Sequence, residues 1–194
     1  MMIKRNSQRG FSLIELLVAV VVFSVGLLAV AGLQTVSKRA NFEGLQRTVA
    51  SQIAYGLLED MRANGNGMAV YLASPNLGGG VVAAEPLPNC SIVGAECNAA
   101  QKAAHDLWFW EDVLDGNQEI GVEGAAGGIL SPTICINGPV GGGAGIYLVS
   151  IAWQGTVAMV GTIQNACGVG SGKYGDSDEL RRIVQVPTFI DPSI

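Results

Sequence analysis

The stretch Arg9-Gly10-Phe11-Ser12-Leu13-Ile14-Glu15-Leu16-Leu17 opens an apolar run that carries no charged residue from Leu16 to Leu33. Glu15 lies inside this hydrophobic segment, where a carboxylate is costly unless a cation pairs with it. An acid in such a position is by default a functional residue. As a helix, the segment 11–33 would be about 34 Å long, which is enough to cross a bilayer.

The residues that flank the apolar run predict its orientation. The leader, residues 1–10, has no acid and carries the basic residues Lys4, Arg5 and Arg9. Such a flank keeps the N-terminus cytoplasmic, so the part of the chain after Leu33 is expected to be exported. Lys38 and Arg39 follow the run and weaken this asymmetry, but the first flank usually dominates.

Composition sets the size and character of the exported part. The chain has 194 residues, of which 49% are apolar, and a net charge of -5. This length suits one spanning helix and one globular domain of about 130 residues. The 27 glycines lie mostly after residue 64, so long loops are expected there. The chain lacks the basic footprint typical of nucleic-acid binding, and no specific nucleic-acid site is inferred.

The four cysteines all follow the apolar run, and they are Cys90, Cys97, Cys135 and Cys167. An even number in an exported domain favours two disulfides, although four cysteines allow three pairings. We expect Cys90 to pair with Cys97 and Cys135 with Cys167, which would stabilise the fold by about 2.5 and about 3.7 kcal/mol in the chain-entropy model. A four-cysteine zinc site is the alternative, but the close Cys pairs typical of such a site are absent.

The spacing of apolar residues predicts one helix from Phe11 to Ala63. Its second half carries apolar residues three or four positions apart on one face, namely Phe42, Leu45, Val49, Ile53, Leu57 and Met61. Asn64-Gly65-Asn66-Gly67 would end this helix, because both residue types tolerate left-handed backbone. A long loop with short elements is expected from Met68 to Pro88, and a second helix from Ala99 to Leu114.

Four strands are expected after the second helix, at Gly128–Ile136, Ile146–Trp153, Thr156–Gln164 and Leu180–Phe189. Trp153-Gln154-Gly155-Thr156 favours a tight hairpin between the second and third of them. The predicted fold class is α+β: a long N-terminal α-helix, with a transmembrane half and an amphipathic half, packed on an antiparallel β-sheet of about four strands with long Gly-rich loops.

The N-terminal motif resembles that of the type IV pilin and pseudopilin family, in which a basic leader ends in Gly and is followed by Phe-Thr/Ser-Leu-Ile-Glu and a long apolar stretch. Gly10, Phe11, Ser12, Leu13, Ile14 and Glu15 match this motif residue by residue. The resemblance implies that a membrane-embedded prepilin peptidase cleaves between Gly10 and Phe11 and N-methylates Phe11. It also implies that Glu15 pairs with the N-terminal ammonium of a neighbouring subunit in a filament, which would supply the missing cation and set the register.

Other interpretations of this segment account for fewer of its residues. Cleavage of an ordinary secretory signal after Ala29-Val30-Ala31 would leave the Gly10-Phe11 context and the placement of Glu15 unexplained. A glutamate that reaches the cytoplasmic interface is compatible with a monomer stored in the membrane. Major pilins often carry a helix-breaking proline where this chain has Gly32, so the helix is expected to stay continuous.

Later segments resemble the PilV-type minor pilins, in the same order along the chain: Ala54–Asn64, Cys97 with Ala104–Leu107 and Trp110, Val149–Trp153, Cys167, and Arg181–Val184. The resemblance implies a non-enzymatic minor pilin of a type IV pilus, in a complex at the filament tip that primes assembly and supports adhesion, twitching motility or DNA uptake. Its partners would be the prepilin peptidase, other minor pilins and the major pilin. The protein would have a leader (1–10), a long helix (11–63) and a periplasmic domain (64–194), and would move from the inner membrane to the extracellular pilus.

Two alternative functions are a minor pseudopilin of a type II secretion system and a pilus-delivered surface-binding (adhesin) module. The length of the cysteine-bearing domain argues against the pseudopilin, because those proteins are usually shorter. The adhesin would use Trp108 and Trp110 as its contact patch. Trp108, Phe109 and Trp110 are consecutive, so they cannot all face one core.

No catalytic residue, metal site or cofactor is predicted. His105 is the only histidine, and without a serine or cysteine motif around it we expect it on an exposed helix face. The acids of the Gly- and Ser-rich loop do not have the spacing of an EF-hand, so solvated acids are expected there rather than calcium ligands; they are Asp176, Asp178 and Glu179.

Overall fold

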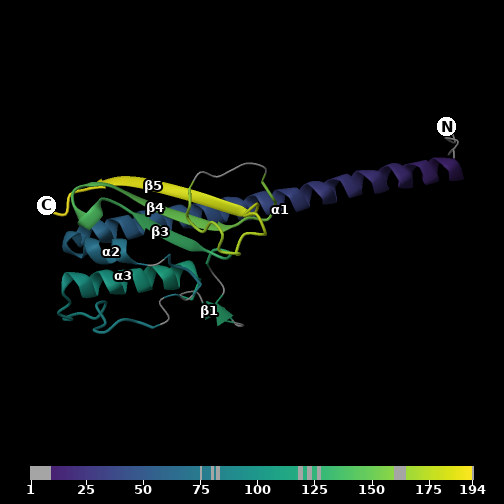
Figure 1. Ribbon diagram of the computed structural model, residues 1–194. Helices are drawn as coiled ribbons and strands as arrows, with labels where there is room; N and C mark the ends of the chain where they lie inside the picture. Colours follow the sequence, from purple (N-terminus) through teal and green to yellow (C-terminus); the bar gives the residue numbers. More distant parts are fainter. Residues whose placement is uncertain are drawn as a thin grey trace, which may run out of the picture. The chain divides into compact units, whose positions relative to one another are not determined.

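The computed structural model describes residues 10–74, 76–79, 81, 84–117, 120–121, 124–125, 128–159 and 165–193. The chain forms two compact units, Met1–Phe42 and Glu43–Ile194. One helix, α1 (Leu13–Ala63), belongs to both of them (Figure 1). It begins two residues later than predicted and ends at the predicted residue. In the first unit, every described side chain is exposed.

The second part of α1 buries one face against the rest of the second unit. Seven residues of this face are buried, namely Gln46, Ala50, Ile53, Ala54, Leu57, Leu58 and Met61. Three of the six predicted apolar positions are therefore in the core, whereas Phe42 and Leu45 stay exposed. The helix stops where Asn64 donates its N–H to the Met61 carbonyl at 3.3 Å, and a 3-10 turn, η1 (Gly65–Gly67), follows.

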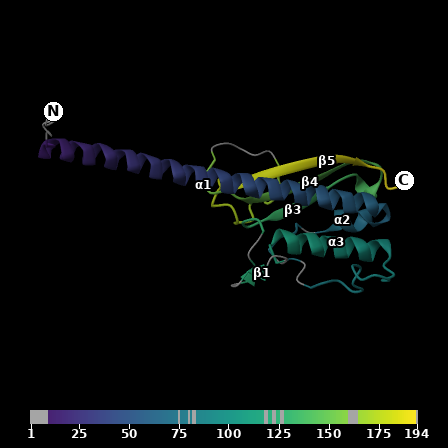
Figure 2. The same cartoon turned by 180° about the vertical axis from the view of Figure 1, so that it is seen from behind.

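A three-stranded antiparallel sheet lies against α1. It consists of β3 (Thr133–Asn137), β4 (Gly145–Gln154) and β5 (Arg181–Ile190), in the order β3-β4-β5, and a 3-10 turn, η2 (Val140–Gly142), precedes β4. Figure 2 shows α1 running along the sheet. Alternate residues of β4 face the helix and are buried: Tyr147, Val149, Ile151 and Trp153. The α+β fold class is confirmed.

The predicted third strand and its hairpin are wrong over the described residues. Residues 156–159 carry no strand, and residues 160–164 lie outside the described part of the chain. Because β4 lies between β3 and β5, it has no free edge for such a hairpin partner. The backbone there bonds elsewhere, since the Met159 N–H donates to the Glu179 carbonyl at 2.8 Å. A separate two-residue ladder joins β1 (Ile120–Gly121) to β2 (Gly124–Ala125).

Two further helices complete the core. α3 (Ala99–Leu114) has the predicted bounds, because Asn98 and Gln101 form a capping box at its start. The Gln101 N–H donates to the Asn98 side chain at 2.9 Å, and the Asn98 N–H donates to the Gln101 side chain at 3.0 Å. The shorter α2 (Met68–Ala73) lies in the segment where a loop with short elements was expected.

Candidate functional site

The N-terminal motif residues lie at the start of α1. Gly10, Phe11 and Ser12 precede the helix, and the Ser12 carbonyl accepts the N–H groups of Glu15 and Leu16 at 3.1 and 3.2 Å. Glu15 is therefore in the first turn, where a carboxylate interacts favourably with the helix dipole. Its side chain is exposed, and it forms no ion pair within the described residues.

The apolar residues that follow Glu15 make α1 a candidate membrane span. By length and composition, α1 is the one candidate membrane span among the described residues. The apolar side chains of the first unit point outwards around the helix, and Phe23 and Leu28 are 67% and 78% exposed. A helix that is apolar on all sides requires an apolar environment, which lipid or a bundle of similar helices provides.

Two disulfides brace the loops of the second unit. Cys90 is joined to Cys97 just before α3, and Cys135 of β3 is joined to Cys167 in the connection between β4 and β5. Cys135 and Cys167 form a small buried cluster with Ala152 and Tyr174, on the sheet face opposite α1. The connection is also held by Arg181, whose guanidinium donates to the Cys167 carbonyl at 2.9 Å.

Acidic side chains of α3 bind α2 and the loop that follows it. Buried Glu111 accepts the backbone N–H groups of Gly78 and Val81 at 2.9 and 2.6 Å. Asp106 accepts a hydrogen bond from the Tyr71 hydroxyl, and burial together with this bond raises the pKa of Tyr71 well above its usual value. These acids are structural, because each is committed to a donor of its own chain.

His105 is buried, so its predicted exposure is wrong. It is 7% exposed, and its Nε2 lies 3.6 Å from the Glu85 carboxylate. A segment that is distant in sequence therefore reaches this side of α3, which the helical pattern alone did not indicate. Trp110 packs against the core, and its indole N–H donates to Asp60 at 2.7 Å. Phe109 is the exposed member of the aromatic triplet.

The acidic loop makes contacts within itself. The Gly170 N–H donates to Asp178, and the Ser177 N–H donates to Glu179, both at 2.9 Å. Among the described residues, no group of three or more His, Cys, Asp or Glu side chains is placed to hold a metal ion.

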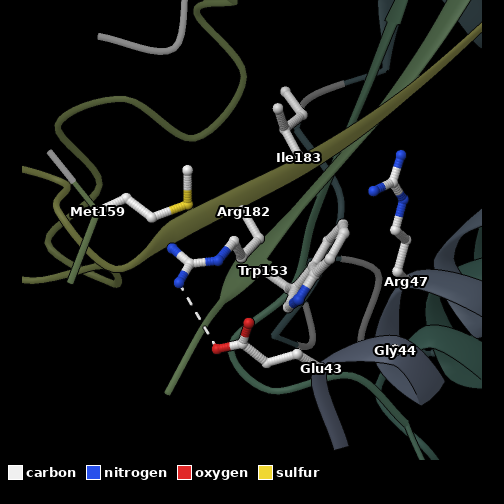
Figure 3. A pocket seen from close by; sticks show the side chains of 7 residues that line it. All are labelled: Glu43, Gly44, Arg47, Trp153, Met159, Arg182 and Ile183. Atoms are coloured by element: carbon white, nitrogen blue, oxygen red, sulfur yellow. Dashed lines mark ion pairs between the residues drawn. The ribbon is translucent and has the colours of Figure 1, made fainter. Parts of the chain in front are cut away.

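A pocket of about 500 Å³ opens beside the second-unit part of α1 (Figure 3). The described residues of its lining come from α1, β4, β5 and the segment after β4, and they are Glu43, Gly44, Arg47, Trp153, Met159, Arg182 and Ile183. Trp153 and Arg182 are register partners in the sheet, so their side chains share one face. Sequence reasoning missed this pocket, because its residues are far apart along the chain.

The charged groups of the pocket differ in how well they are paired. The Glu43 carboxylate accepts the N–H and hydroxyl of Thr156 at 2.9 and 2.7 Å, and lies 3.5 Å from the Arg182 guanidinium. Arg182 Nη2 donates to the Val157 carbonyl at 2.6 Å, whereas its buried Nη1 has no acceptor among the residues that the structure describes. In Figure 3 the Arg47 guanidinium points away from this pair, and it has no hydrogen bond or ion pair within the described residues.

An unpaired donor lies in the lining of the same pocket. Trp153 is 3% exposed, and its indole Nε1 is buried with no hydrogen-bond acceptor in the described part of the chain. Buried polar groups in native proteins are nearly always paired, so two unsatisfied N–H donors beside one cavity are unusual. The pocket therefore combines an apolar wall with unsatisfied donors.

Two protein families match the chain over residues 5–108. Residues 5–31 match the prokaryotic N-terminal methylation motif, and residues 32–108 match the family of type IV pilin Tt1218. The first match contains the segment Gly10–Glu15, and the second contains the amphipathic part of α1, α2 and part of α3. No curated protein and no solved structure matched the chain.

Proposed function

The chain belongs to the type IV pilin-like family, and from this premise we propose that it is a minor pilin in a complex at the filament tip that primes pilus assembly. The methylation motif implies processing by a prepilin peptidase and assembly with other pilins. The main observation behind the proposal concerns Glu15. It is an exposed acid in the first turn of an apolar helix, and it has no ion pair among the described residues. We infer a structural role, without catalysis by this chain.

Cleavage between Gly10 and Phe11 would create the cation that Glu15 lacks. A new α-amino group at Phe11 is protonated near neutral pH. In an apolar surrounding, a carboxylate and an ammonium that meet at the correct stagger offset each other's desolvation, while a mismatched stagger leaves both unpaired. Glu15 would thus select the register in which subunits leave the membrane and stack, each helix exchanging lipid contacts for contacts with other helices.

The second unit would determine which subunits are neighbours. Large apolar side chains are exposed on its surface, in the segment before α3 that contains the Cys90–Cys97 disulfide and on the β4–β5 pair: Leu87, Ile92, Val93, Ile146 and Phe189. Ile146 and Phe189 are register partners, so they form one continuous patch. Exposed apolar patches are typical of protein interfaces, which supports a role in subunit contact. The adhesin alternative receives less support, since Trp110 is packed against the core.

The test begins with the mature N-terminus. We expect mass analysis of the protein from cells to give a chain that begins at N-methylated Phe11, and a Glu15→Gln variant that is still processed but enters pili poorly. Glu59→Gln is the matched control, because Glu59 lies on the same helix in the second unit. A mature chain that begins elsewhere would overturn the proposal.

The minor role in a pilus needs a separate experiment. We expect deletion of the gene to abolish or strongly reduce piliation while protein secretion continues, and the protein to be a small fraction of purified pili. Loss of secretion with intact pili would instead identify a pseudopilin.

A further inference from the structure

We propose that the pocket beside Gly44 is a binding site for a carboxylate attached to an apolar group. The inference does not depend on the role in the pilus, because it rests on the pocket alone. Three observations carry it: the excess of donors, the space above Gly44 and the apolar wall.

The polar groups of the pocket that lack partners are all donors. Within the described part of the chain, Trp153 Nε1 and Arg182 Nη1 are buried without acceptors, and the exposed Arg47 guanidinium has no partner. The acid of the pocket, Glu43, is already bound to Thr156 and Arg182. With two guanidinium groups and one carboxylate, the described residues of the lining have a surplus positive charge. An entering group must therefore accept hydrogen bonds, and an anion would be favoured.

Gly44 has no explanation within the fold. Glycine is unfavourable in a helix interior, and a Cβ at Gly44 would meet nothing within 4 Å. Gly56 on the same helix is different, because a Cβ there would lie 2.2 Å from the Trp110 ring. The fold requires glycine at position 56 but not at position 44. Gly44 instead lines the pocket, and a side chain at this position would reduce the volume of the pocket.

The wall of the pocket indicates what accompanies the anion. Trp153, Met159 and Ile183 contribute apolar surface next to the donors. Ligand sites commonly combine an apolar lining with a few convergent polar groups. An inorganic anion would leave these apolar side chains exposed to water, whereas an acid with an aliphatic or aromatic group would bury them. An acidic side chain of an adjoining pilin and a free organic acid offer the same chemistry.

The experiment follows the indole N–H signals of the full chain in nonionic maltoside micelles by proton–nitrogen NMR. The chain has 3 tryptophans, so Trp153 is assigned with a Trp153→Phe variant. Phenylbutyrate is the probe, and phenylbutanamide is its uncharged control. We expect phenylbutyrate to shift the Trp153 signal saturably, the amide to act at least roughly tenfold more weakly, and Trp108 and Trp110 to stay unmoved. No shift, or equal shifts with acid and amide, would overturn the proposal.

Two pairs of variants locate the binding. Arg47→Gln should weaken binding by roughly tenfold or more, while Arg39→Gln, a cation of α1 outside the pocket, should not. Gly44→Leu should abolish binding by filling the space, while Gln52→Leu adds the same side chain to an exposed position elsewhere on α1. Normal binding by either pocket variant, with the fold verified by the remaining NMR signals, contradicts the site.

A titration of protein concentration, without added ligand, distinguishes a carboxylate of a neighbouring subunit from that of a free organic acid. If a neighbouring subunit supplies it, the Trp153 signal of the ligand-free chain should move with protein concentration, and Arg47→Gln should remove this dependence. If a free organic acid supplies it, the signal should be independent of protein concentration and respond only to the added acid. Either result preserves the carboxylate site and names its occupant.

Discussion

Glu43 ties α1 to the segment that follows β4. The Thr156 hydroxyl, followed by the Thr156 N–H and the Arg182 guanidinium, holds the pKa of the Glu43 carboxyl below its usual range, against the opposing effect of partial burial. A group with a lowered folded pKa stabilises the fold above its unfolded pKa, and this contribution is lost as the pH falls through the folded pKa.

This sign gives a prediction for Glu43→Gln. At pH 7 we expect the free energy of unfolding to fall by roughly 1 kcal/mol. The difference from the unmodified chain should shrink as the pH falls from about 4.3, the usual glutamate value, through the lowered pKa of Glu43 in the folded chain, because the unfolded chain takes up the proton first. Urea denaturation of the two proteins in micelles, at pH 7 and at acidic pH, measures this difference in the free energy of unfolding. Glu96→Gln, at an exposed position, is the control. A loss that stays constant down to pH 2 to 3 would argue against the charge as its cause.

At the scale of elements, the Cys135–Cys167 disulfide fastens the connection between β4 and β5 onto β3. Its cysteines are 32 positions apart, and those of Cys90–Cys97 are 7 apart. Closing a longer loop removes more entropy from the unfolded chain. Cys167 is also 4% exposed, so its replacement disturbs the packing of a buried cluster.

We therefore expect the two disulfides to differ in their contribution. Replacing Cys135 and Cys167 with Ser should lower the free energy of unfolding by about 3.7 kcal/mol or more, and replacing Cys90 and Cys97 by about 2.5 kcal/mol. Urea unfolding of the two double variants provides the comparison. Equal losses would mean that the loop length does not govern the stabilisation.

The elements that the sequence predicted well are those defined by local signals. Asn98 and Gln101 mark the start of α3, and the Asn-Gly repeat after Ala63 marks the end of α1. The third strand failed for a non-local reason, since Thr156 and Met159 are bonded to Glu43 and Glu179 rather than to β4.

The candidate sites also differ in whether their residues are contiguous in the sequence. The motif Gly10–Glu15 is contiguous and was visible in the sequence, whereas the pocket joins segments that only the sheet register brings together. Gly44, a glycine inside an amphipathic helix, was its one local signal. The prediction for His105 was wrong because its contact with Glu85, 20 positions earlier in the sequence, depends on the path of the segment before α3.

At the scale of the whole molecule, the two units differ in what surrounds them. The first unit exposes apolar side chains along its length, and the second has a buried core of its own. Val21 and Leu28 lie near the middle of the apolar run and are 62% and 78% exposed. Arginine near the centre of a membrane helix costs about 2.5 to 3.5 kcal/mol per residue in insertion experiments.

We accordingly expect a Val21→Arg, Leu28→Arg double variant to be lost from the membrane fraction after alkaline carbonate extraction. Tyr55→Arg should remain there, because Tyr55 is exposed on α1 in the second unit. Immunoblots of the two fractions give the result. Retention of the double variant would show that the first unit is not the anchor.

The sheet order has a consequence for how each copy is made. The face of α1 that carries Leu57 and Met61 is completed by β4 and β5, which are synthesised long after α1. While the chain grows, this apolar face has no native cover, although α1 itself was synthesised early. Each nascent chain therefore exposes an apolar, aggregation-prone face from the time α1 is synthesised until β4 and β5 have been added. A premature stop codon before β5 should yield an aggregating product rather than a smaller folded one.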